Sequence, residues 1–294
     1  MPAELIDGRA IAKKIRDEAA VKAKKLAERG IRPGLVVVLV GEDPASVVYT
    51  SSKAKAAEEA GMYSLNLRLP AATSERELLD KIDELNANPQ VHGILVQMPL
   101  PKQINPDTVI RRIDPAKDVD GFHPVNVGKM LIGERDGFIP CTPAGIQVML
   151  RESGVKTPGK DCVIIGRSNI VGKPMAALMT QDNDNANCTV TVCHRHTADL
   201  KGHTRMADIL IVAAGRPRMV TADMVKSGAV VIDVGTNRIA DPGTKSGTRL
   251  VGDVDFDSVR EVASKITPVP GGVGPMTIAM LMANTVRAAE MSAR

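Results

Sequence analysis

The sequence predicts an α/β protein of two domains, in which helices cover mostly parallel sheets. Short, continuously apolar segments such as residues 35–40 and 161–166 alternate with longer segments whose apolar residues recur at helical spacing. The 294 residues include no Trp, two Tyr and three Phe, so Val, Ile, Leu, Met and Ala must build the core. Such a composition is typical of strands that are buried on both faces of a parallel sheet.

The element order in the first half follows from periodicity and end signals. Apolar spacing over residues 4–29 predicts a helix, and the apolar run that follows predicts a buried strand. The helix predicted over residues 44–60 has Asp43 as N-cap and Gly61 just beyond its end. A strand, a helix and a strand are then predicted over residues 64–69, 74–86 and 93–97.

The second half begins after residues 114–143, which are rich in Gly, Pro and Asp and predict a cleft-lining connection. A helix from residue 142 leads into four compact apolar runs with helical spacers, which is Rossmann-like organisation. These runs cover residues 161–166, 189–193, 207–213 and 229–234.

The end of the chain and the domain boundaries complete the predicted fold. Residues 241–247 predict a turn-rich insertion, and the helix expected over residues 275–290 should pack back on the first domain. We therefore expect one domain from residues 1–143 plus 277–294 and a second from residues 144–276.

Charge and hydropathy exclude several classes of protein. The net charge is +4 with acidic and basic residues interleaved, so no nucleic-acid surface is expected, although a small anionic ligand suits the excess. No stretch approaches the ~18 apolar residues of a membrane span, and the N-terminus lacks an apolar signal core. Four cysteines without CxxC spacing indicate reduced thiols. We expect a cytoplasmic protein that binds no membrane.

A candidate phosphate-binding turn runs from Gly166 to Gly172, after a predicted strand and before a helix. Its glycines are six residues apart rather than in GxGxxG spacing, so an ordinary tight turn remains an alternative. The next strand is followed by His194-Arg195-His196 instead of the acid that usually holds an NAD ribose. Arg167 and Arg195 could together hold a 2′-phosphate.

Candidate catalytic residues lie in the first half. Tyr49 and Lys53 are one turn apart on the predicted helix, where a solvent-exposed lysine is the simpler interpretation. Gln97 ends a strand at the edge where α/β sheets bind ligands. Asp118 and Asp120 lie in a Gly- and Pro-rich loop and could instead cap turns. No metal is expected, because the Cys- and His-containing segment 188–203 fits no standard zinc spacing.

Five motifs, in this order, resemble the bifunctional methylenetetrahydrofolate dehydrogenase/cyclohydrolase family over almost the whole chain. They are Tyr49-x-x-x-Lys53, Val96-Gln-Met-Pro-Leu-Pro101, Lys117-Asp-Val-Asp-Gly-Phe122, Gly166-Arg-Ser-x-x-Val-Gly-x-Pro174 and Thr267-Pro-Val-Pro-Gly-Gly-Val-Gly-Pro-Met-Thr277. The resemblance implies an N-terminal folate-binding catalytic domain, a C-terminal NADP-binding domain and a homodimer in tetrahydrofolate interconversion and purine biosynthesis.

The resemblance also implies roles for individual residues. Lys53 would be the catalytic acid/base, Gln97 its hydrogen-bond partner, and Asp120 the pterin anchor. The catalytic and folate-binding residues would be Tyr49, Lys53, Val96, Gln97, Met98, Asp120, Pro270, Gly271, Gly272, Val273 and Gly274. The NADP-binding residues would be Gly166, Arg167, Ser168, Val171, Gly172, Arg195 and Thr236, the last where the family usually carries Ile.

The implied chemistry suits these residue types. Hydride transfer from the methylene carbon to NADP needs positioning, whereas hydrolysis of the methenyl cation needs a proton carrier such as a lysine of lowered pKa. One folate site would serve both reactions. The alternatives are a monofunctional methylenetetrahydrofolate dehydrogenase and a folate- or nucleotide-binding protein without turnover.

Overall fold

The structure is a computed structural model that describes residues 1–244 and 247–293. Lys245 and Ser246, within the expected insertion 241–247, and Arg294, at the end of the expected first domain, lie outside the described residues. The chain forms two compact units. Unit 1 comprises Met1–Ile11 and Thr142–Thr277, and unit 2 comprises Ala12–Cys141 and Ile278–Arg294.

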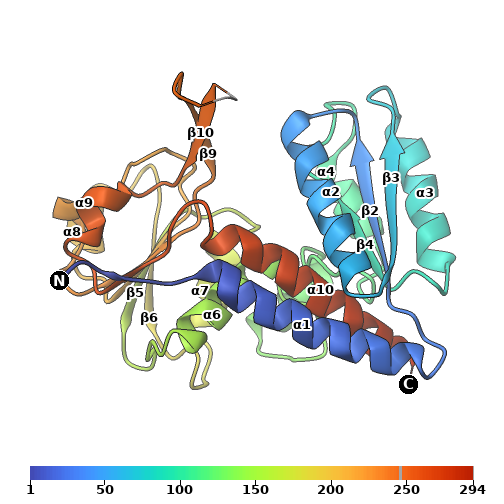
Figure 1. Cartoon of the computed structure of the whole chain (residues 1–294), viewed down its shortest axis with the longest axis horizontal. Helices are drawn as coiled ribbons and strands as arrows, with labels where there is room; N and C mark the ends of the chain where they lie inside the picture. Colours follow the sequence, from blue (N-terminus) through green and yellow to red (C-terminus); the bar gives the residue numbers. More distant parts are fainter. Residues whose placement is uncertain (245–246, 294) are drawn as a thin grey trace. The chain divides into compact units, whose positions relative to one another are not determined.

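Unit 2 is built on a three-stranded parallel sheet in the order β3-β2-β4 (Figure 1). Its strands are β2 (Gly34–Val40), β3 (Tyr63–Leu69) and β4 (Gly93–Val96). Its helices are α2 (Pro44–Glu59), α3 (Glu75–Ala87), α4 (Pro106–Arg112), α5 (Pro124–Leu131) and most of α1 (Gly8–Ala27) and α10 (Val273–Ser292).

The central strand β2 is buried along its whole length because helices cover both faces of the sheet. Leu35 and Val37 contact a cluster formed with α1, α2 and α10. Val36 and Val38, which point to the other face, contact α3 and α4. The apolar run therefore has the two-sided burial that the sequence predicts for a parallel strand.

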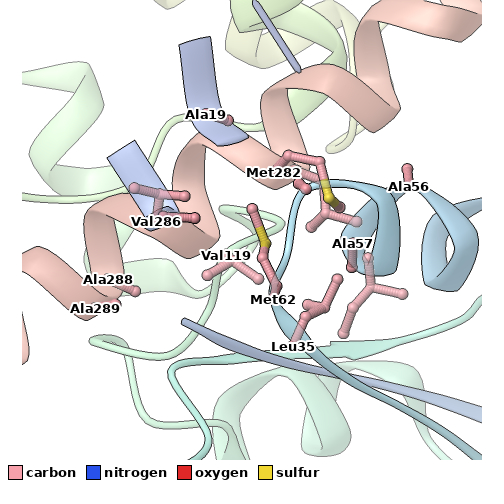
Figure 2. Packing of buried hydrophobic residues seen from close by; sticks show 14 of the residues in the cluster. Ala19, Leu35, Ala56, Ala57, Met62, Val119, Met282, Val286, Ala288 and Ala289 are labelled. Carbon is pink, nitrogen blue, oxygen red and sulfur yellow. The ribbon is translucent and has the colours of Figure 1, made fainter. Parts of the chain in front are cut away.

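The last helix packs within unit 2, as the sequence predicts. Val286 and Ala289 of α10 belong to the same buried cluster as Ala19 of α1 and Met62, which precedes β3 (Figure 2). Small alanine side chains of α1 and α10 pack closely in this cluster, to which Phe138 contributes an aromatic ring.

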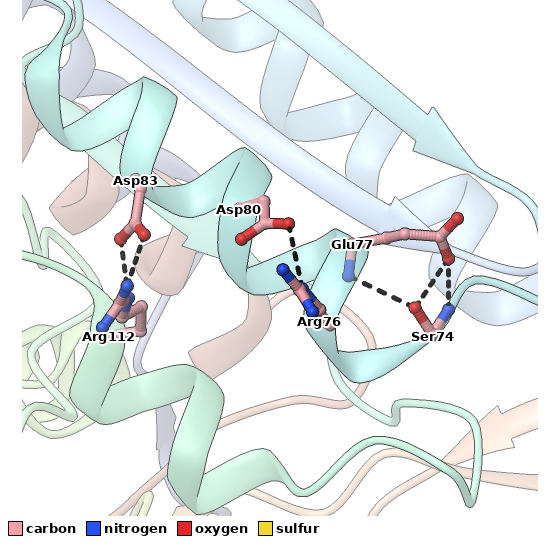
Figure 3. Close-up of polar contacts among 6 residues, drawn as sticks. All are labelled: Ser74, Arg76, Glu77, Asp80, Asp83 and Arg112. Carbon is pink, nitrogen blue, oxygen red and sulfur yellow. Dashed lines mark hydrogen bonds and ion pairs between the residues drawn. The ribbon is translucent and has the colours of Figure 1, made fainter.

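Polar end signals fix the helices of unit 2. Asp43 accepts a hydrogen bond from the Ser46 backbone at the start of α2. Ser74 and Glu77 form a capping box that begins α3, and Arg112 of α4 pairs with Asp83 of α3 (Figure 3). The caps therefore follow the sequence pattern.

Unit 1 contains a six-stranded sheet in the order β1-β11-β8-β7-β5-β6, and all its strand pairs are parallel. The strands are β1 (Glu4–Leu5), β5 (Asp161–Ile165), β6 (Thr189–Cys193), β7 (Ile209–Val212), β8 (Val230–Asp233) and β11 (Lys265–Ile266), and β9 (Asn237–Ala240) pairs antiparallel with β10 (Thr248–Val251). The helices are α6 (Cys141–Glu152), α7 (Gly172–Met179), α8 (Leu200–Thr204), the 3₁₀ turn η1 (Ala222–Met224) and α9 (Phe256–Arg260). The predicted α/β class and Rossmann-like second half are confirmed.

The N-terminus differs from the prediction of one helix over residues 4–29. Residues 4–5 instead form β1, whose backbone pairs with β11, and α1 begins at Gly8 after an Asp7 side chain that accepts from the backbone of Arg9. This pairing is between segments about 260 residues apart. Residues 1–11 therefore belong to unit 1, whereas the sequence places them with residues 12–143.

The segment that joins the two halves of the sequence contains a helix. Within residues 114–143, expected as an irregular connection, α5 forms because His123 caps it and Pro124 occupies its first turn. None of the helices in the described part of the chain combines the length and apolar character that crossing a bilayer requires.

Candidate active site

One face of α2 is buried, and Lys53 lies on it. Thr50 and Ala57, one turn before and after, are fully buried, and Lys53 is 8% exposed. Tyr49 is 43% exposed. The simpler alternative of a solvent-exposed lysine is therefore wrong, because Lys53 is buried, whereas Tyr49 reaches the surface.

A hydrogen bond joins Lys53 to Gln97, as the resemblance implies. Lys53 Nζ donates to Gln97 Oε1 over 2.8 Å. Gln97 follows β4 and donates its own Nε2 to the Met98 carbonyl over 2.7 Å. Because the amide nitrogen is engaged by Met98, the amide oxygen is directed at the lysine.

Burial lowers the pKa of Lys53 from its ordinary value, and electrostatic interactions with Asp120 and Cys141 oppose the effect. The partner in direct contact, Gln97, is neutral and stabilises the ammonium less than a carboxylate would. The site therefore favours an amine that can both accept and return a proton.

Asp120 is held by a loop that its neighbour Asp118 organises. Asp118 is 2% exposed and accepts hydrogen bonds from the backbone of Gly121 and His123 and from the Asn126 side chain. Burial raises the pKa of Asp118 to about 6. Asp118 thus has the turn-capping role that the sequence allows for both acids. The Asp120 carboxylate does not cap this turn and can therefore serve another function.

Asp120 and Lys53 influence each other electrostatically. Desolvation raises the pKa of Asp120, although part of the residue is exposed, while the Lys53 charge and the nearby Cys141 thiol lower it. Cys141 is buried, and its Sγ donates to the Val119 carbonyl over 3.3 Å. The structure thus brings together Lys53, Gln97, Asp120 and Cys141, of which only the thiol has no signal in the sequence.

Not all of the other residues predicted to bind folate contact Lys53, Gln97 and Asp120. The Val96 side chain packs in the core cluster of the α3 and α4 face, and Met98 follows Gln97 in the loop after β4. Residues 270–274 lead into α10 and belong to unit 1, where Pro270 is exposed and Gly272 is buried. Their contact with folate stays a prediction.

In unit 1, the turn between β5 and α7 requires both of its predicted glycines. An added Cβ would lie 2.3 Å from the Ala213 carbonyl oxygen at Gly166, whose φ is +121°, and 2.1 Å from the Gly166 oxygen at Gly172. Ser168 Oγ accepts from the Val171 backbone over 3.2 Å. The backbone therefore makes a compact turn at the N-terminus of α7, a suitable place for phosphate groups.

The two arginines follow neighbouring parallel strands at the same sheet edge. Arg167 comes after β5 and Arg195 after β6, and both are exposed. Arg195 donates from Nε to His196 Nε2 over 3.0 Å, which orients its guanidinium. Thr236 is exposed after β8, a strand of the same sheet.

Two buried acids that the sequence analysis missed shape this edge. Asp253 accepts from the backbones of Ala214, Gly215 and Arg216, and Asp233 accepts from the backbones of Gly235 and Val254. Burial raises the pKa of Asp233 to about 6. Their only sequence signal is an aspartate at or just after a strand end.

Other features of the described residues do not compete with these sites. A cavity of about 700 Å³ in unit 2 is lined by Arg32, Tyr63 and His92, which lie at the amino-terminal ends of β2, β3 and β4. Gln97 lies at the opposite, carboxyl-terminal end of β4. No group of three or more described His, Cys, Asp or Glu residues is arranged to hold a metal.

Known proteins match both halves of the chain. The family model "Tetrahydrofolate dehydrogenase/cyclohydrolase, catalytic domain" matches residues 6–120, and the model for the family's "NAD(P)-binding domain" matches residues 140–293. The "Bifunctional protein FolD" of Halalkalibacterium halodurans is 60% identical over 99% of this chain and 100% of its own length.

Solved structures agree over nearly the full length. The bifunctional FolD enzyme of Campylobacter jejuni is 50% identical, covers 98% of this chain and 99% of its own, and has a TM-score of 0.93. The Trypanosoma brucei enzyme, solved with NADP cofactor and inhibitor, is 42% identical over 100% and 99% of the two chains, with a TM-score of 0.95. The chain therefore belongs to the tetrahydrofolate dehydrogenase/cyclohydrolase family, and its predicted resemblance to these bifunctional enzymes is confirmed.

Proposed function

We propose that this enzyme oxidises 5,10-methylenetetrahydrofolate with NADP and hydrolyses the resulting 5,10-methenyl compound to 10-formyltetrahydrofolate at one folate site. The observation that carries the proposal is the buried Lys53 amine, hydrogen-bonded to Gln97 and electrostatically coupled to Asp120. Family membership supplies the two activities, and these residues supply the shared site.

In the first reaction, NADP held by Gly166, Arg167 and Arg195 would supply the acceptor for a hydride. Loss of that hydride from the methylene carbon leaves a methenyl cation on folate. The protein needs no base for this step, because the carbon loses a hydride rather than a proton. Asp120 is suited to accept the N–H donors on the pterin edge, which fixes the face that folate presents. Tyr49, one turn before Lys53 on α2 and 43% exposed, would lie beside the bound folate.

In the second reaction, water adds to the methenyl carbon and one carbon–nitrogen bond breaks. The neutral Lys53 amine takes the first proton that the water loses, and the resulting ammonium protonates the departing ring nitrogen. The remaining hydroxyl proton passes to solvent as the formyl carbon–oxygen double bond forms. Gln97 keeps Nζ in place through both states, since its oxygen can accept from either form of the amine. The lowered pKa of Lys53 favours this exchange, because a larger share of the amine is neutral than in an exposed lysine.

One assay separates this function from its alternatives. With purified protein, NADP and methylenetetrahydrofolate, absorbance reports both NADPH and the methenyl compound. The bifunctional enzyme forms NADPH and consumes added methenyl compound faster than buffer does. A monofunctional dehydrogenase would form NADPH without accelerating hydrolysis, and a binding protein would do neither.

The choice of NADP over NAD is supported by Arg167, Arg195 and the turn between Gly166 and Gly172. A side chain at either glycine would overlap backbone atoms of the turn. Because both positions are glycine, the backbone can form this tight turn and approach a diphosphate closely. Two guanidiniums at one edge, without an acid at the end of β6, suit a 2′-phosphate.

Replacing both arginines by alanine should weaken NADP selectively. Loss of two charge-assisted contacts is expected to cost about 3 kcal/mol, or roughly 10²-fold in the ratio of kcat/KM for NADP to that for NAD. The control is Arg205→Ala, an exposed arginine after α8 in the same unit. An unchanged ratio in the double variant would show that the 2′-phosphate is held elsewhere.

A homodimer in the cytoplasm is the second part of the proposal. The strand β3 is an uncovered sheet edge whose Tyr63 and Leu65 are each 37% exposed. Ser64 Oγ and Asn66 Oδ1 on the same strand are buried without a hydrogen-bond partner among the described residues.

Sedimentation equilibrium should give a particle of twice the chain mass. The variant Leu65→Asp should shift the measured mass toward that of the monomer. A monomeric parent protein would exclude the dimer.

A further inference from the structure

Asn284 of α10 contacts the segment that carries Asp120, although it is far from it in sequence. The side chain is 7% exposed, and its Nδ2 donates to the Val119 carbonyl over 2.9 Å and to the Ile139 carbonyl over 3.2 Å. The same nitrogen lies 3.6 Å from Cys141 Sγ. All three partners are acceptors, so the orientation of the amide is determined.

These contacts hold Asp120 from both sides. Val119 directly precedes Asp120, and the Cys141 thiol donates to the Val119 carbonyl and lies close enough to the Asp120 carboxylate to influence its pKa. Gly121, which directly follows, has a φ of +78°, and an added Cβ there would lie 2.6 Å from the Ile139 carbonyl carbon. The loop is therefore packed against residues 139–141, and Asn284 joins the two segments.

We propose that Asn284 is a positioning residue for folate binding, which holds the Asp120 carboxylate in place through Val119 and Cys141. This inference rests on the proposed role of Asp120. Asn284 does not touch the reacting atoms in this account; it removes the freedom of the loop on which the carboxylate stands.

The variant Asn284→Leu keeps a side chain of similar size and removes both donors. The KM for methylenetetrahydrofolate should rise by about 10²-fold, the effect of a displacement near 1 Å, while the KM for NADP stays unchanged. Thr285→Val is the matched control, since Thr285 is fully buried on the same helix and donates only to the Leu281 carbonyl of that helix. It should leave both KM values unchanged.

A double-variant cycle with Asp120→Asn tests the mechanism. If Asn284 acts through Asp120, the combined variant has the same folate KM as Asp120→Asn alone. If the two substitutions instead raise the folate KM by the product of their separate effects, the inference about Asn284 is wrong. It is also wrong if Asn284→Leu has the folate KM of the parent while Asp120→Asn has a raised one. Neither result would affect the proposed role of Asp120. A parent-like KM for Asp120→Asn would overturn the proposed role of Asp120 itself. Circular dichroism checks folding, and Asn284→Ala replaces the leucine variant if that one does not fold.

Discussion

Replacement of Lys53 by glutamine is expected to separate the two activities of the enzyme. Cyclohydrolase should fall by roughly 10²–10⁴-fold, the usual contribution of general acid–base catalysis, because the amide cannot exchange a proton. Dehydrogenase turnover should survive in part, since hydride transfer needs only a positioned folate. Methenyltetrahydrofolate should then accumulate.

The measurement is a paired assay of both activities on one preparation, with circular dichroism to confirm folding. Lys55→Gln is the matched control, because Lys55 lies two residues later on α2 with its side chain exposed and should leave both rates unchanged. Parent-rate hydrolysis by folded Lys53→Gln would mean that Lys53 is not the acid/base, whatever its burial.

Loss of the Asp120 carboxylate should affect both activities together. Asp120→Ala removes an acceptor for two pterin N–H donors, so kcat/KM for folate should fall by about 10²–10⁴-fold in each reaction, from ~1.5–3 kcal/mol per charged hydrogen bond. NADP binding should remain intact, because the predicted cofactor residues lie in unit 1.

The Asp120 experiment compares steady-state constants for folate and NADP in the parent, Asp120→Ala and Asp107→Ala. Asp107 is an exposed acid in the first turn of α4 and serves as the control for charge. An equal loss of NADP affinity in Asp120→Ala would place Asp120 on the cofactor side and contradict the assignment.

The strands and helices that position the site could be predicted because their signals are local. The apolar run 35–40 can be buried only as a covered strand, and Asp43 with Gly61 marks the ends of α2. The positions of Lys53 on a helix and Gln97 at a strand end make them candidates, and the resemblance implies the hydrogen bond between them that the structure contains.

The features that the sequence does not predict depend on contacts between segments far apart in the chain, which the periodicity of apolar residues does not reveal. The strand β1 exists only because β11 pairs with it, and its two residues have no strand pattern of their own. Asn284 lies in a largely apolar helix, where a buried polar residue has many explanations, and Cys141 carries no motif. Their importance appears only when the fold places them beside the Asp120 loop.

The central claim is that one folate site performs both reactions, and inhibition by tetrahydrofolate tests it most directly. With NADP present at the same saturating concentration, its inhibition constant is measured against methylenetetrahydrofolate oxidation and against methenyltetrahydrofolate hydrolysis. A shared site predicts competitive inhibition with the same constant in both assays. Inhibition of only one reaction, or two constants that differ by tenfold or more, would show separate sites and contradict the account.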